Sequence, residues 1–220
     1  MTGSGREDFD KHLDEVLVGG REARVLEIVG YTPSWSTRFE WERQRIENVL
    51  GSVVRRIEHV GSTAVPGLAA KPIIDADVVV ATERDVARVI ASLATLGYRW
   101  EGDLGVVGRE AFRAPEDAAL PPHHLYSVTE DGRAYADHRL LRELLREDPV
   151  ACQRYTALKR RNAVIAGADL DRYVALKAAF VAEHLTLARQ QRHLPPVAYW
   201  LPDVDRERGA PPTSAARGGT

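Results

Sequence analysis

The sequence is poor in cysteine and methionine, with one residue of each among 220. The single cysteine, Cys152, excludes a disulfide framework and a cysteine-based structural zinc site, and we interpret it as structural. No apolar run approaches the roughly 18 residues that a bilayer span requires, so we expect no membrane-spanning segment. The N-terminus also lacks the basic-then-apolar pattern of a signal peptide, which predicts a cytoplasmic protein.

An excess of one charge sign is also missing. Thirty basic residues stand against 32 acidic ones, for a formal net charge of −2. The chain as a whole is therefore not an electrostatic nucleic-acid binder, and we expect no nucleic-acid partner, although a local basic groove stays open. No internal repeat argues for a solenoid or a propeller, and the sequence has no G-x-x-x-x-G-K-[ST] kinase loop.

What is present divides the chain into four parts. Residues 1–20 are an N-terminal extension, 21–132 mix strand-like and helical segments, 133–194 are helical throughout, and 195–220 are rich in Pro, Gly and charge. Strands that arrive in a run, with one clear helix between them, favour an α+β sheet over a doubly wound one. We therefore predict an α+β fold, with a mixed sheet, three C-terminal helices packed on it and a disordered end at about 205–220.

Capping signals and periodicity predict the individual elements. Thr37 and Glu40 fit a capping box for a helix that ends at Gly51, and Thr82 caps the next helix. Strands are expected where β-branched and alternating residues cluster, at 53–60, 73–80, 98–101, 110–114 and 123–129. The C-terminal helices should run from 135 to about 147, from Pro149 to Gly167, and from about 169 to 192.

The strand expected at 73–80 carries two acidic residues. Alternate side chains of a strand share a face, so Asp75 and Asp77 should project side by side, opposite an apolar face. Two close carboxylates repel each other, and a divalent cation relieves the repulsion. Mg²⁺ prefers one or two carboxylates completed by phosphate oxygens and water. An isolated D-x-D also fits an exposed polar face, so this pattern alone leaves both interpretations open.

The residues before this strand favour the metal interpretation. Gly61 and Ser62 directly follow the strand at 53–60, and Thr63 can begin a short helical turn. A glycine allows close approach of the backbone to a ligand, and hydroxyls with free amides hold phosphate oxygens. A strand ending in G-S, a short helix and a D-x-D strand resemble the signature of the DNA polymerase β-like nucleotidyltransferase superfamily.

The longer run HVGSTAVPGLAAKPIID closely resembles the GrpB family, a bacterial branch assigned to that superfamily. The resemblance covers about residues 30 to 190, including Gly108-Arg109, His123-His124, Tyr155-x-x-Leu158-Lys159 and Tyr173-x-x-x-Lys177. It implies Mg²⁺-dependent transfer of a nucleotidyl group from a nucleoside triphosphate, expected to be ATP, to an unknown small-molecule acceptor.

The resemblance also implies roles for individual residues. Asp75 and Asp77 would hold Mg²⁺ or Mn²⁺ and be catalytic, and His124 would ligate the metal or move a proton. The residues expected to bind the nucleotide are Gly61, Ser62, Thr63, Lys71 and Arg109. We interpret Lys159 and Lys177 as surface lysines with snorkelling side chains, and Tyr155 and Tyr173 as core aromatics.

The chain departs from the family pattern at several positions. Tyr126 replaces a histidine, Glu143 replaces an aspartate, and none of Asp103, Glu110 and Glu130 fits the third carboxylate that the superfamily places on a later strand. Two alternatives therefore stay open: a non-catalytic nucleotide-binding or sensing module, and an ATP-dependent amide ligase that forms an acyl-adenylate. No residue identifies the acceptor, and the oligomeric state cannot be inferred.

Overall fold

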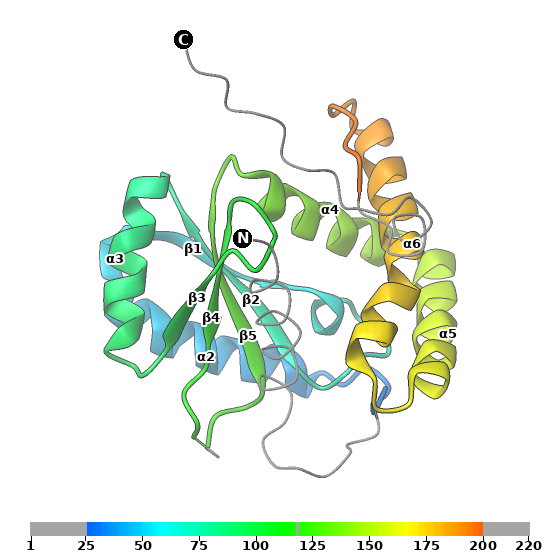
Figure 1. The fold of residues 1–220 in the computed structure, drawn as a ribbon, viewed down its shortest axis with the longest axis horizontal. Coiled ribbons are helices and arrows are strands. Elements are labelled where there is room, and N and C mark those ends of the chain that lie inside the picture. Colours follow the sequence, from blue (N-terminus) through cyan, green and yellow to red (C-terminus); the bar gives the residue numbers. More distant parts are fainter. Residues whose placement is uncertain (1–25, 118, 200–220) are drawn as a thin grey trace, which may run out of the picture.

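A computed structural model of the protein describes residues 26–117 and 119–199. Five strands form one mixed sheet (Figure 1): β1 Val54–Val60, β2 Ile74–Val80, β3 Arg99–Gly102, β4 Arg109–Arg113 and β5 His123–Thr129. The helices are α2 Ser34–Leu50, α3 Glu83–Ala94, α4 Arg133–Glu147, α5 Pro149–Ala166 and α6 Leu170–Gln191. The predicted α+β class with a helical C-terminal half is confirmed. The expected N-terminal extension and disordered end lie outside the described residues.

The strand order β1-β2-β5-β4-β3 brings distant parts of the sequence together. β5 is the last strand in the chain, yet it lies between β2 and β4, parallel to β2 and antiparallel to β4. The register of β2 and β5 places Asp75 opposite His124 and Asp77 opposite Tyr126. The D-x-D strand therefore has β1 on one side and β5, then β4, on the other.

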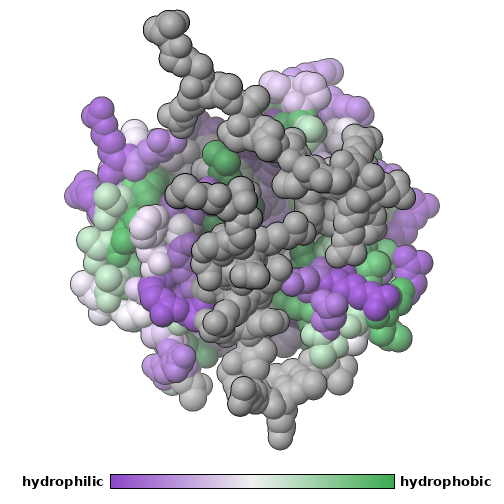
Figure 2. Space-filling model, in the orientation of Figure 1, coloured by the Kyte–Doolittle hydropathy of each residue, from purple (hydrophilic) through white to green (hydrophobic). Residues whose placement is uncertain are grey.

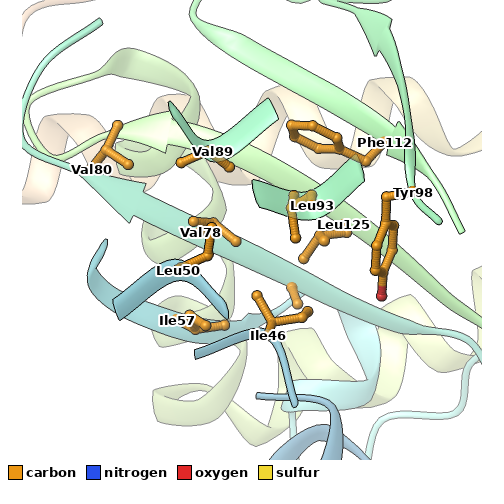
Figure 3. Packing of buried hydrophobic residues seen from close by; sticks show 11 residues of the cluster. Ile46, Leu50, Ile57, Val78, Val80, Val89, Leu93, Tyr98, Phe112 and Leu125 are labelled. Carbon is orange, nitrogen blue, oxygen red and sulfur yellow. The ribbon is translucent and has the colours of Figure 1, made fainter. Parts of the chain in front are cut away.

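One face of the sheet carries the main core (Figure 3). Val78, Val80 and Leu125 pack against Ile46 and Leu50 of α2 and against Val89 and Leu93 of α3. Burying a side chain of this size is worth about 1.5–3 kcal/mol. The predicted inward face of β2 is therefore correct, and it leaves the two aspartates on the opposite face of the sheet.

The helical half lies to one side of the sheet, away from α3 (Figure 1). Leu140 and Leu144 of α4 pack with Leu185 and Ala188 of α6 and with residues of α5 in a second core. Asp148 caps α5, because its carboxylate accepts hydrogen bonds from the backbone N–H groups of the first turn at 2.9 Å. No helix in the described part of the chain is long and apolar enough to cross a membrane.

One predicted boundary is wrong. α2 begins at Ser34, directly after Pro33, so Thr37 and Glu40 lie inside the helix and form no capping box at its start. The fixed φ of proline opens the helix earlier than the capping pattern suggested, and Glu40 instead accepts hydrogen bonds from Arg43. Where the face in Figure 2 is coloured, hydrophilic residues lie between smaller hydrophobic areas.

Candidate active site

Each aspartate of the D-x-D pair accepts a hydrogen bond from a histidine. His124 on β5 donates from Nδ1 to Asp75 at 2.9 Å, and His138 on α4 donates from Nδ1 to the two oxygens of Asp77 at 2.8 and 3.1 Å. The Asp75 side chain is 27% exposed, whereas that of Asp77 is fully buried. The interpretation of D-x-D as an exposed polar face is therefore wrong for Asp77.

In both pairs, interactions with charged neighbours outweigh the effect of burial on a pKa. Burial would raise the pKa of Asp75, but the hydrogen bond from His124 and the charges of Lys177 and Lys71 outweigh it and lower that pKa. Burial would likewise lower the pKa of His138, but the charge and hydrogen bond of Asp77 raise it. Asp75 is thus held ionised.

The turn after β1 is built around Asp75. Gly61 has φ +68°, and a Cβ atom there would overlap Oδ2 of Asp75 and lie 2.8 Å from its Cγ. The sequence suggested that this glycine lets a ligand approach the backbone. In the structure, the Asp75 carboxylate itself occupies that space, so the turn and the carboxylate are fitted to each other.

Hydrogen bonds fix the next residue of the turn. The Thr63 hydroxyl donates to the Ile73 carbonyl at 3.3 Å, so Nε2 of His59 must donate to Thr63 Oγ1 across 2.9 Å. Burial lowers the pKa of His59 to about 4, which keeps the ring neutral at pH 7. Thr63 is 1% exposed. The Thr63 hydroxyl therefore holds the turn, and nucleotide binding by Thr63 stays a prediction. Ser62 makes no side-chain hydrogen bond to any described residue.

Helix α4 clamps this turn from the other side. Nη1 of Arg142 donates to the His59 carbonyl at 2.7 Å, and its Nη2 pairs with Glu58 at 2.8 Å. Arg146 donates from Nε and Nη2 to the Ala64 carbonyl at 3.0 and 2.6 Å. The turn that carries Gly61 and Ser62 is therefore held rigidly between the sheet and α4.

Three lysines gather on the Asp75 side of the pair. Nζ of Lys71 and Nζ of Lys177 lie 6.0 and 5.3 Å from the centroid of the Tyr173 ring, and Nζ of Lys159 lies 4.5 Å from that of Tyr155. Lys159 is 2% exposed, and its ammonium has no hydrogen-bond partner among the residues that the structure describes. The surface interpretation of Lys159 is therefore wrong, whereas Tyr155 and Tyr173 are buried as expected.

The lysines repel one another. Burial, then the charge of Lys177, lowers the pKa of Lys71 to about 8 and that of Lys159 to about 7. Among the described carboxylates, Asp75 acts on all three lysines, and it raises each pKa only in part. A buried positive cluster with too little negative charge is the arrangement that an anionic ligand would stabilise.

Arg109 stands on the opposite side of the pair. It is on β4, and its Cζ lies 4.4 Å from the centroid of the Tyr126 ring, which in turn lies 5.9 Å from that of His138. The structure thus brings the predicted residues to one face of the sheet, with Lys71 beside Asp75 and Arg109 beyond Tyr126.

In the described part of the chain, each carboxylate considered for a third position has a partner away from Asp75 and Asp77. Asp103 accepts a hydrogen bond from Gly105 N, Glu110 accepts one from Trp100 Nε1, and Glu130 pairs with Arg56. Glu143 pairs with Arg139 and Arg192. Among the described residues, no group of three or more histidine, cysteine, aspartate or glutamate side chains could hold a metal ion. Asp75 and Asp77 therefore fit a hard cation only with ligand and water oxygens completing its coordination.

Sequence reasoning missed His138. Its signal was the spacing of α4, where Tyr135, His138, Arg142 and Arg146 recur at helical intervals and form a polar stripe. Each of the four contacts the sheet or the turn after β1. Tyr135 donates to Glu58, and His138 donates to Asp77. Arg142 and Arg146 donate to the backbone carbonyls of His59 and Ala64. A search for helical periodicity among polar as well as apolar residues would have predicted that this polar stripe of α4 faces the sheet.

Comparison with known proteins identifies the family of this chain. A family model described as GrpB, GrpB protein, matches residues 25–187. The UPF0157 protein YqkA of Bacillus subtilis is 30% identical over 158 residues, which are 72% of this chain but only 46% of YqkA, so the chain spans about half of that relative. The structure of the conserved protein GrpB from Enterococcus faecalis is similar with a TM-score of 0.67 at 31% identity, covering 76% of this chain and 99% of that one. A structure of Cid1 with its short product ApU has a TM-score of 0.45 at 12% identity, over 70% of this chain and 46% of its own.

Proposed function

The chain belongs to the GrpB family, which its sequence motifs already resemble. On this basis we propose that it is a nucleotidyltransferase that acts on a small molecule. The observation that carries the proposal is the fit between the turn at Gly61 and Asp75, with three lysines beside it. A fixed turn, the ionised Asp75 and excess positive charge suit the phosphates of a nucleoside triphosphate, with ATP as the expected co-substrate.

In the proposed reaction, an oxygen of the acceptor attacks the α-phosphorus of the triphosphate. A new phosphorus–oxygen bond forms, the bond from the α-phosphorus to the bridging oxygen breaks, and pyrophosphate leaves. The acceptor proton passes to His124 or to water. Asp75 and Asp77 would hold a Mg²⁺ or Mn²⁺ ion, which when bound would neutralise charge on the phosphate oxygens.

The chain's own residues would bind and orient the triphosphate. The Ser62 hydroxyl and the amides of the turn would donate to phosphate oxygens, because α4 already fixes the turn. Lys71, Lys159 and Lys177 would offset the charge of the departing pyrophosphate, and an anion there would raise their pKa values again.

A mass-spectrometric screen tests the proposal. The protein is incubated with each nucleoside triphosphate, Mg²⁺ or Mn²⁺ and a metabolite pool, and released pyrophosphate and new nucleotidylated products are measured. Asp75→Asn and Asp77→Asn should abolish both signals, whereas Asp131→Asn, at an exposed position outside the site, should not change them. Equal turnover by Asp75→Asn and the wild type would contradict the proposal.

A non-catalytic nucleotide sensor is the second candidate. It is favoured by His124 and Tyr126, which stand opposite the two aspartates on β5 where a third carboxylate is missing. The two functions differ in one result. A sensor binds the triphosphate tightly with either metal and releases no pyrophosphate in the full screen.

A further inference from the structure

Arg109 is a partly buried cation that has no counter-ion among the described residues. Its Nε atom is buried and has no hydrogen-bond partner there, and no carboxylate of residues 26–117 and 119–199 forms an ion pair with it. Arg113, on the same strand, does have an acidic partner, because its Nε lies 2.6 Å from Glu101 Oε1. Leaving a buried guanidinium nitrogen without a partner is unfavourable for folding, so the position is explained better by binding than by stability.

The guanidinium is held in a fixed orientation next to the D-x-D pair. It stacks on Tyr126 at 4.4 Å, and Tyr126 is the β5 residue opposite Asp77. The Tyr126 ring also approaches the ring of His138, which donates to Asp77. A stacked planar guanidinium loses little freedom when it binds a carboxylate or phosphate with two parallel hydrogen bonds.

The order of the strands separates Arg109 from the lysines. Lys71, Lys159 and Lys177 lie where the loop between β1 and β2 meets α5 and α6, and Ala69 of that loop donates to Thr156 of α5 at 3.2 Å. Arg109 lies two strands from β2 in the other direction. The Asp75–Asp77 pair therefore has one positive region on each side.

In nucleotidyl transfer, the attacking and leaving oxygens lie on opposite sides of the reacting phosphorus. If pyrophosphate leaves toward the lysines and the turn at Gly61, the acceptor enters over β5 and β4. We propose that the acceptor is a small anion, whose carboxylate or phosphate group binds to Arg109 stacked on Tyr126. This role replaces the nucleotide-binding role that the sequence predicted for Arg109. This inference rests on the proposed function, and it names the substrate class of the same site.

The probe is a small-molecule extract freed of nucleotides and separated by ion exchange into anionic and non-anionic fractions. Part of the anionic fraction is treated with phosphatase, which separates a phosphate acceptor from a carboxylate one. Wild type, Arg109→Gln and Arg109→Lys are compared, with Arg99→Gln on the exposed part of β3 as the matched control. Product formation is followed by mass spectrometry, and the affinity for a non-hydrolysable triphosphate by calorimetry.

We expect product from the anionic fraction alone. Arg109→Gln should lower that turnover at least about 30-fold, since loss of one partner of a buried charged contact has a large effect, while triphosphate affinity stays within about twofold. Arg109→Lys should be intermediate because it lacks the bidentate fork. Product from the non-anionic fraction, or full activity of Arg109→Gln, would overturn the inference.

A binding measurement separates this inference from the proposed function. The anionic fraction, with the non-hydrolysable triphosphate present, should raise the melting temperature of the wild type and of Arg99→Gln but not of Arg109→Gln. If this shift occurs and no fraction gives product, the anion site stands and the nucleotidyltransferase proposal fails. If no fraction shifts the wild type, the anion site is refuted, whatever the turnover.

Discussion

At the scale of single residues, the site depends on the fit between Gly61 and Asp75. Gly61→Ala should displace the carboxylate, because the new Cβ would overlap Oδ2. Gly67→Ala is the matched control, since Gly67 also has a positive φ but has open space at its Cβ. We expect Gly67→Ala to destabilise by about 1 kcal/mol, from backbone strain alone, and Gly61→Ala to destabilise more and to lose metal-dependent nucleotide binding. Denaturant unfolding and calorimetry measure the two effects. Unchanged binding by Gly61→Ala would refute the proposed fit.

Lys159 gives a second prediction at this scale. Its pKa is lowered to about 7, so between pH 7 and about pH 10 the unfolded chain binds a proton that the folded chain does not. Wild-type stability without ligand should therefore rise over that interval. Lys159→Met should be more stable than wild type at pH 7, by up to about 4 kcal/mol, and this advantage should vanish near pH 10. Arg160→Met, at an exposed position of α5, should have little effect at either pH. Urea unfolding across the range tests this, and a destabilised Lys159→Met at pH 7 would contradict it.

At the scale of elements, the sequence predicted nearly every helix and strand of the described chain. The signals were local, such as the capping aspartate at 148 and the alternation along β2. The place of β5 could not be predicted, because a parallel pairing between residues 49 positions apart depends on the packing of the whole sheet. For the same reason Asp75 and His124 were each proposed for the site, but their direct hydrogen bond was not. His138 stayed hidden because its partner, Asp77, lies 61 positions away.

The turn between β1 and β2 should be the acid-sensitive element. His59 holds it as a neutral ring, with its pKa lowered to about 4 in the folded protein. As pH falls from 6.5 to 4, the unfolded chain takes up a proton that the folded chain resists, so stability should decrease, by up to about 3 kcal/mol from this group. His59→Gln, whose amide can still donate to Thr63, should flatten that decrease. His193→Gln, at an exposed position, should leave the profile unchanged. An unaltered slope in His59→Gln, measured by urea unfolding, would assign the effect to other groups.

At the scale of the whole molecule, the proposed ligand would join the two halves, since the sheet supplies Asp75 and Asp77 and the helices supply Lys159 and Lys177. A triphosphate with Mg²⁺ or Mn²⁺ should therefore stabilise both halves together, by about 2.7 kcal/mol at a hundredfold excess over Kd. Hydrogen exchange should show slower exchange in the turn after β1 and in α5 and α6 at once. Asp75→Asn should lose this effect and Asp131→Asn should keep it. Protection confined to one half, with binding intact, would show that the ligand does not bridge them.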